Sequence, residues 1–109
     1  MFVTTIYRYQ TESGREPVTV WLERLRDKIA SAAIRVRLRR LEAGNFGDSK
    51  SVGDGVAELR VDVGAGYRVY YARHGRDVVM LLCGGDKRTQ DGDIQTAKRY
   101  WADFKRRNA

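Results

Sequence analysis

The fold of this chain is decided by residues 58–87, which read ELRVDVGAGYRVYYARHGRDVVMLLCGGDK. Polar and apolar residues alternate before Gly64 and again after Gly66, which is the period of a strand with one buried face. Residues 78–83 are apolar throughout, so we expect a central strand that is covered on both sides. The stretch therefore predicts three consecutive strands, and the glycines that follow at 84 and 85 are expected to end the third.

The first two strands are predicted to pair around the turn at residues 64–66. Cross-strand partners point to the same face of a sheet, and a three-residue turn meets this condition by placing Val63 opposite Tyr67. Asp62 then lies opposite Arg68. A two-residue turn would pair polar with apolar positions throughout.

A type II′ hairpin is predicted at residues 74–77, because glycine stands at its first central position. This register places Arg68 beside Cys83 and leaves Lys87 near the arginine. One face of the sheet, pointing away from the core, is expected to carry the polar residues Glu58, Arg60, Asp62, Arg68 and Tyr70.

Helices are predicted before and after these strands. Pro17 stands where a first helical turn accepts proline. Asp27 can cap a second helix, which Gly44 is placed to end in a left-handed conformation. The last helix spans about residues 90–108. The inner faces are predicted to be Val18, Trp21, Leu22 and Leu25; then Ala30, Ile34, Leu38 and Leu41; and then Ile94, Ala97, Trp101 and Phe104.

The remaining segments complete the order of elements. Residues 2–9 are rich in β-branched and aromatic side chains and predict a first strand. Residues 45–54 are interpreted as a loop that contains Lys50. The order β-α-α-β-β-β-α indicates an α+β fold with a mainly antiparallel sheet. The chain has 109 residues and no repeat or linker, which predicts a single domain over residues 1–109.

Charge favours a polyanionic partner. Lys and Arg number 21 against 14 Asp and Glu, a formal net charge of +7. RNA, DNA, a ribosome or an acidic protein would suit this excess, and a merely solubilising surface is the alternative. The outer face of the second helix is expected to add exposed charge through Arg35, Arg37, Arg39 and Arg40.

The sequence offers no cofactor or metal site. Cys83 is the single cysteine and is expected to be a buried thiol, and His74 is the single histidine and is expected at a hairpin tip. Together they cannot form a zinc ligand set. The chain begins without the apolar run of a signal peptide, and its longest apolar stretch is too short to span a bilayer, which predicts a cytoplasmic protein.

Three segments resemble one known group of proteins: Glu58-Leu59-Arg60, Gly66-Tyr67-Arg68-Val69-Tyr70-Tyr71, and Leu82-Cys83-Gly84-Gly85-Asp86-Lys87. With the basic final helix, they resemble the RelE/HigB/ParE toxin superfamily, and more narrowly its phage-derived HigB-like addiction-module killer proteins. The resemblance implies a RelE-like fold and a toxin encoded beside a helix-turn-helix, HigA-like antitoxin. It also implies a metal-independent endonuclease that cuts mRNA in the ribosomal A site.

The resemblance also implies site residues. Arg68 matches the phosphate-contacting arginine of the Gly-Tyr-Arg strand, and Lys87 or Arg88 occupies the place of a second basic residue. Two positions depart from the family pattern: Glu58 stands where a lysine is common, and Ile94 stands near the place of a tyrosine.

The chemistry of metal-free RNA cleavage gives the candidates roles. A 2′-hydroxyl must lose a proton, a dianionic phosphorane must be stabilised and a 5′-oxygen must gain a proton. Arginine presents a planar fork to phosphate, lysine among arginines can act as acid or base, and carboxylate and phenol are further proton carriers. The predicted catalytic residues are Arg68, Lys87, Arg60, Tyr70 and Glu58, and the predicted RNA-binding residues are Lys50, Arg88, Arg35, Arg39 and Lys98.

Other interpretations remain open at this point. A ladder of solvated cross-strand ion pairs would give the polar face the same residues without any function. A ParE-type toxin that poisons DNA gyrase without catalysis would share the Arg68 segment. A decayed prophage domain that binds only its antitoxin or nucleic acid is a third possibility.

Overall fold

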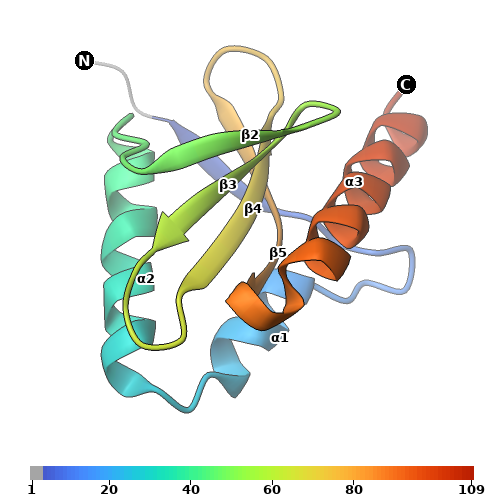
Figure 1. Ribbon diagram of the computed structural model, residues 1–109. Coiled ribbons are helices and arrows are strands. Elements are labelled where there is room, and N and C mark those ends of the chain that lie inside the picture. Colours follow the sequence, from blue (N-terminus) through green and yellow to red (C-terminus); the bar gives the residue numbers. More distant parts are fainter. Residues whose placement is uncertain (1–3) are drawn as a thin grey trace.

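The computed structural model describes residues 4–109 and shows a mixed five-stranded sheet between helices (Figure 1). The strands are β1 (Thr5–Arg8), β2 (Ser49–Gly53), β3 (Val56–Val61), β4 (Tyr67–Arg73) and β5 (Val78–Asp86). The helices are α1 (Pro17–Arg24), α2 (Lys28–Glu42) and α3 (Gln90–Arg107), with a 3₁₀ turn η1 (Lys87–Thr89) before α3. The predicted α+β class is confirmed. Phe2 and Val3, predicted to open the first strand, lie outside the described residues.

The sheet order is β1-β5-β4-β3-β2. The pairings of β2 with β3, β3 with β4 and β4 with β5 are antiparallel, whereas β1 pairs with β5 in parallel. The sheet is thus mainly antiparallel, as predicted, but mixed. The interior position predicted for residues 78–83 is confirmed, because β5 lies between β1 and β4.

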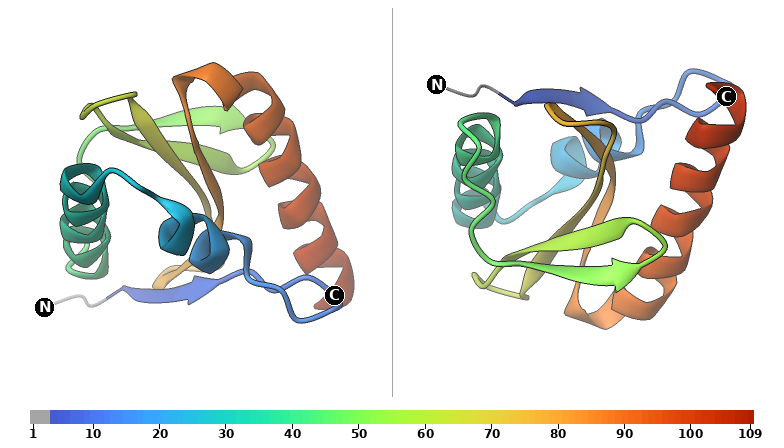
Figure 2. Two further views of the ribbon diagram at one scale, coloured as in Figure 1. Left: turned by 90° about the horizontal axis from the view of Figure 1, so that it is seen from below. Right: turned by 90° about the horizontal axis from the view of Figure 1, so that it is seen from above.

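Each face of the sheet has its own helices (Figure 2). Helices α1 and α2 cover one face through a core that includes Leu22, Ile34 and Leu59, and α3 covers the other through Ala97 and Trp101. Apart from Pro17, the buried residues of the three helices are those that the helical spacing predicts. Trp21, Leu25, Ile94 and Phe104 complete these faces as partly buried side chains.

The predicted helix ends are also confirmed. Pro17 is the first residue of α1, and the Ala30 N–H donates to Asp27 Oδ1 over 3.0 Å at the start of α2. Gly44 follows α2 with a φ of +84° and donates to the Leu41 carbonyl. Such a φ is the left-handed conformation that glycine adopts without strain.

One strand was missed. Residues 45–54 were predicted as a loop, but they include β2, an edge strand that pairs with β3. Its first three residues, Ser49, Lys50 and Ser51, are all polar and show no polar–apolar alternation, and Val52 is only partly buried. Only pairing with β3 creates the strand.

The predicted registers were wrong. Arg60, not Asp62, lies opposite Arg68. This shift of two residues lengthens the turn and preserves which side chains share a face, since strand side chains alternate with period two. On the other side, Arg68 pairs with Gly85, not with Cys83. The predicted type II′ hairpin was wrong, because Arg73 pairs with Val79 and the turn is one residue longer than predicted; a bulge after Tyr70 shifts the β4–β5 ladder by one residue more.

Gly84 and Gly85 were predicted to end the strand, and this prediction was wrong, because both lie inside β5. A Cβ atom at Gly84 would overlap the Trp21 ring of α1, and one at Gly85 would overlap the Asp93 carboxylate of α3. Both helices therefore approach the sheet closely only because these two positions lack side chains.

Candidate functional site

The candidate residues form two rows across neighbouring strands on the α3 side of the sheet. Cross-strand pairing gives a first row, Lys50–Glu58–Tyr70–Cys83, on β2, β3, β4 and β5. It gives a second row, Arg60–Arg68–Gly85, on β3, β4 and β5. The structure thus brings Glu58, Arg60, Arg68 and Tyr70 together, as the alternation predicts.

Glu58 is the centre of this cluster. Arg60 Nε donates to its Oε1 over 3.0 Å, and Arg68 Nε lies 4.0 Å from the same oxygen. From α3, the Gln90 side-chain amide donates to both carboxylate oxygens, at 3.4 and 3.0 Å. One carboxylate therefore holds two guanidiniums of adjacent strands and the first residue of α3.

The expectation that this face points away from the core was wrong. Glu58 is 1 % exposed, Arg68 4 % and Tyr70 0 %, because α3 covers them. Arg60 differs, since 32 % of its side chain is exposed. The ladder of solvated ion pairs is excluded for Glu58 and Arg68; their pairing is buried, where losing either partner is costly.

Two polar atoms in the cluster have no hydrogen-bond partner within the described part of the chain: Arg68 Nε and the Tyr70 hydroxyl. Arg68 is otherwise held by its Nη1, which donates to the Tyr67 carbonyl over 3.1 Å and lies 3.6 Å from Asp62 Oδ1. Burial raises the pKa of Tyr70, and the nearby Glu58 and Asp93 carboxylates raise it further. The phenol therefore stays protonated and is a donor without an acceptor.

The first turn of α3 closes the site beside Gly85. Thr89 Oγ1 donates to Asp93 Oδ2 over 2.5 Å. Burial raises the pKa of Asp93, Asp86 adds to this, and the Thr89 hydrogen bond opposes it. Cys83 lies below the same turn, 3.7 Å from the Asp93 carbonyl oxygen, and is the buried free thiol that the sequence predicts.

Lys87 and Arg88 lie where β5 passes into α3. The Lys87 side chain lies next to Gly66, at the start of β4, since a Cβ atom there would be 3.3 Å from Lys87 Cδ. Arg88 Nη2 donates to Asp86 Oδ2 over 3.1 Å, a pairing that lowers the pKa of Asp86 and raises that of Arg88. Both basic side chains are exposed and border a hollow of about 590 Å³ that extends along the first turns of α3.

The predicted RNA-binding residues divide into two groups. Lys50 joins the cluster as an exposed residue opposite Glu58, and Arg88 lies at the same end of the sheet. Arg35 and Arg39 do not join it, because they are exposed on α2, which covers the opposite face. Lys98 lies 3.5 Å from Asp54, near the other end of β3.

One arginine of the supposedly exposed face of α2 has a different role. Arg37 donates to the carbonyl oxygens of Arg60, Phe46 and Asp48, at 2.6, 3.3 and 3.4 Å. These hydrogen bonds connect α2 to β3 and to the segment that precedes β2, so Arg37 has a structural role.

Sequence reasoning missed Gln90. Nothing in the residue pattern distinguishes it from other polar residues at a helix start. The only available signal was its place directly after the candidate basic residues 87 and 88. Its contact with Glu58 joins residues 32 positions apart, and only the packing of α3 on the sheet creates it.

The aromatic candidates are packing residues, as predicted. The rings of Trp101 and Phe104 stack with centroids 5.5 Å apart. His74, exposed at the β4–β5 turn, contacts both rings edge-on. Within residues 4–109, no group of three or more His, Cys, Asp or Glu is placed to hold a metal ion.

No helix within residues 4–109 has both the length and the apolar character needed to cross a membrane. The chain is 56 % identical over 78 residues to an uncharacterized protein of Haemophilus influenzae, an alignment that covers 72 % of this chain and 79 % of the relative. The sequence model of the phage-derived Gp49-like proteins (DUF891) matches residues 20–103, which include both rows of the site and most of α3. The chain therefore belongs to the phage-derived Gp49-like family, which is associated with the toxins of toxin–antitoxin modules.

Proposed function

We propose that the chain is the toxin of a toxin–antitoxin module and cleaves ribosome-bound mRNA without a metal, as the resemblance to the RelE/HigB proteins implies. The observation that carries this proposal is the direct cross-strand pairing of Arg60 with Arg68. Like charges directly opposite each other destabilise a sheet. Two guanidiniums held together in this way, by one buried carboxylate, can form charge-assisted hydrogen bonds to a phosphate.

Accessibility assigns the roles within the site. Arg60 is the guanidinium with solvent access, so it meets the scissile phosphate. Glu58 is held by Arg60, Arg68 and Gln90, so it positions the guanidiniums and does not act as the base. Arg68, whose Nε has no hydrogen-bond partner within the described residues, adds positive charge behind the phosphate.

Proton transfer falls to the groups at the rim. Lys87 is exposed beside the start of β4 and can exchange a proton with a 2′- or 5′-oxygen. Tyr70 is protonated but buried, so it donates only when α3 moves away from the sheet. Ile94, near the place of the family's tyrosine, packs against the apolar core and transfers no proton.

The burial of Glu58, Arg68 and Tyr70 favours one alternative, a ParE-type toxin that poisons gyrase by binding. Such a protein presents a surface and needs no open catalytic face. The two functions differ in their products: the first cuts mRNA and stops translation, and the second causes double-strand breaks in DNA.

The test is induction of the chain without its antitoxin, with protein synthesis, mRNA ends and DNA breaks measured in parallel. We expect protein synthesis to stop and mRNA to be cut within codons. Gyrase-dependent DNA breaks with continuing protein synthesis would transfer the chain to the ParE class. Normal growth would contradict both toxin functions and favour a domain that only binds its antitoxin or nucleic acid.

Arg60→Ala tests the site itself. Loss of a guanidinium that stabilises the phosphorane should lower RNA cleavage by about a hundredfold or more, and Arg60→Lys should restore only part, since a point charge does not replace a fork. Arg26→Ala, which removes the same charge from an exposed residue between α1 and α2, is the matched control. Arg68→Ala is a poorer test, because breaking a buried pair costs about 3–5 kcal/mol of stability. A folded, fully active Arg60→Ala variant would refute the assignment.

A further inference from the structure

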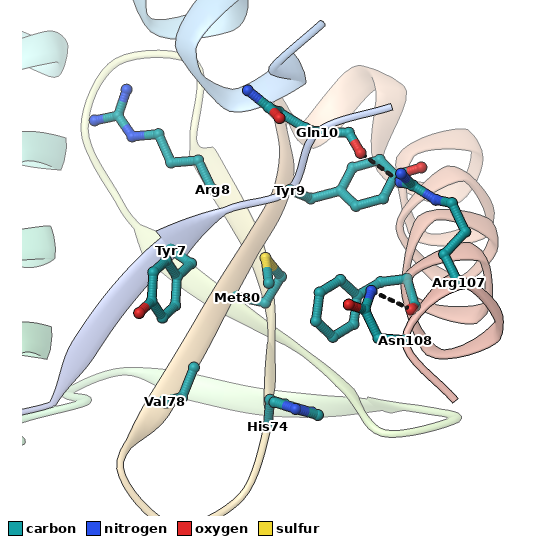
Figure 3. A pocket seen from close by; sticks show the side chains of 10 residues that line it. Tyr7, Arg8, Tyr9, Gln10, His74, Val78, Met80, Arg107 and Asn108 are labelled. Carbon is teal, nitrogen blue, oxygen red and sulfur yellow. Dashed lines mark hydrogen bonds between the residues drawn. The ribbon is translucent and has the colours of Figure 1, made fainter. Parts of the chain in front are cut away.

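A second feature lies at the opposite end of β5 from the arginine rows. It is a groove of about 400 Å³ between β1 and the last turns of α3 (Figure 3). Its apolar lining includes Tyr7, Tyr9, Met80 and Phe104, and its polar lining includes Arg8 and Arg107. The site proposed above uses none of these residues.

The groove borders a sheet edge that is open beyond Thr4, whose N–H donates to the Glu42 carbonyl of α2. The N–H groups of Thr5 and Tyr9 donate to the carbonyls of Asp77 and Leu81 on the β5 side. Alternate residues of a parallel strand point to opposite edges, so the N–H groups of Ile6 and Arg8 face outward. An extended segment of another chain can pair with such groups.

The two edges of the sheet are protected differently. The β2 edge carries Lys50 between two serines and a register shift before Gly53, features that discourage pairing with another chain. The β1 edge carries Tyr7, which is 55 % exposed although it is a large apolar side chain. Only the β1 edge therefore combines free backbone groups with an apolar surface.

Two arginines beside the groove favour an acidic binding segment. Figure 3 shows Arg8 and Arg107 on either side of Tyr9. Arg8 Nη1 donates to Thr19 Oγ1 over 2.8 Å, and Arg107 bonds to Asp103 and to the Gln10 carbonyl. These contacts leave guanidinium donors of both residues for an incoming carboxylate.

We propose that this groove binds an extended acidic segment of the antitoxin, which adds a strand along β1. One apolar side chain of the segment inserts over Met80 between Tyr7 and Phe104, and its carboxylates meet Arg8 and Arg107. The identity of the partner as an antitoxin rests on the proposed function. The binding surface does not depend on it, and it leaves the arginine rows uncovered.

The test uses the purified product of the gene that adjoins the gene of this chain, and measures its affinity by calorimetry. Tyr7→Ala should weaken binding by about tenfold or more, because a central aromatic anchor is lost. Ile29→Ala is the matched control, since Ile29 on α2 is an exposed apolar residue too, at 76 %, and should leave the affinity unchanged.

The backbone is tested at Arg8. Arg8→Pro removes the outward N–H and should weaken binding much more than Arg8→Ala, which removes only the side chain. Hydrogen exchange of the wild-type chain provides a check that needs no variant: the Ile6 and Arg8 amides should exchange fast alone and be protected in the complex.

Three results would overturn the proposal. They are absence of binding, binding without protection of these two amides, and a free chain that dimerises through this edge, shown as a dimer that Tyr7→Ala dissociates. RNA cleavage measured on the same samples judges the proposed function separately.

Discussion

Glu58 and Leu59 are neighbours on β3, are both almost completely buried, and point to opposite faces of the sheet. Leu59 enters an apolar core with α1 and α2 that any residues of suitable volume could build. Glu58 enters a cluster with Arg60, Arg68 and Gln90 in which each charge depends on the others. The comparison indicates that stability is organised on the first face, whereas the second accepts a costly arrangement in order to hold two guanidiniums together.

The largest effect is expected for the reaction rate of the Cys83 thiol, which depends on whether α3 covers the polar face. Burial, with a contribution from Asp93, raises the pKa of this thiol from 9.0 to about 12. About a thousandfold less thiolate is then present near neutral pH, so an aromatic disulfide reagent should react at least that much more slowly than in concentrated urea. Rapid reaction of the folded chain would show that α3 opens often, and the two faces would then differ in dynamics as well.

Glu58→Gln should break the polar face. The change preserves shape but leaves Arg60 and Arg68 opposite each other without their shared carboxylate, and removing one member of a buried ion pair costs about 3–5 kcal/mol. Urea unfolding measures this loss. Asp62→Asn is the control: it also removes a partner of Arg68, but one with 70 % of its side chain exposed, so its cost should stay within about 1 kcal/mol.

Leu59→Met gives the matching change on the apolar face. It also preserves approximate volume, at a site that is just as buried, and it should cost less than about 1.5 kcal/mol. The quantity to compare is the loss in the free energy of unfolding caused by Leu59→Met and by Glu58→Gln. If both substitutions cost the same in urea unfolding, the distinction between the two faces is wrong.

The smallest effect is expected for Tyr70→Phe. The hydroxyl is buried and unpaired within residues 4–109, so removing it should leave the free energy of unfolding unchanged or raise it by about 1 kcal/mol. A marked loss of stability would show that a water molecule or another group satisfies this hydroxyl. Loss of RNA cleavage at unchanged stability would instead assign the phenol to the reaction.

Much of the fold could be predicted because it depends on local rules. Alternation with period two assigned Arg60, Arg68 and Tyr70 to one face, and this assignment survives the wrong register because the error was two residues. Caps at Asp27 and Gly44 fixed the ends of α2 through backbone geometry alone. The resemblance led to the toxin superfamily, and the family match confirms its coarser part, the association with toxin–antitoxin modules.

What the sequence determined by itself was therefore which side chains share a face and where helices begin and end, since both follow from the geometry of a few consecutive residues. Tertiary structure alone decided that β2 is a strand, that Arg60 faces Arg68, and that α3 buries the polar face. Each of these depends on contacts between distant segments: the pairing of β2 with β3, a turn of unforeseen length, and the absence of a side chain at Gly85 that lets Asp93 approach. Gln90 reaches Glu58 for the same reason, because the free energy of packing a helix on a sheet is not encoded in any local pattern.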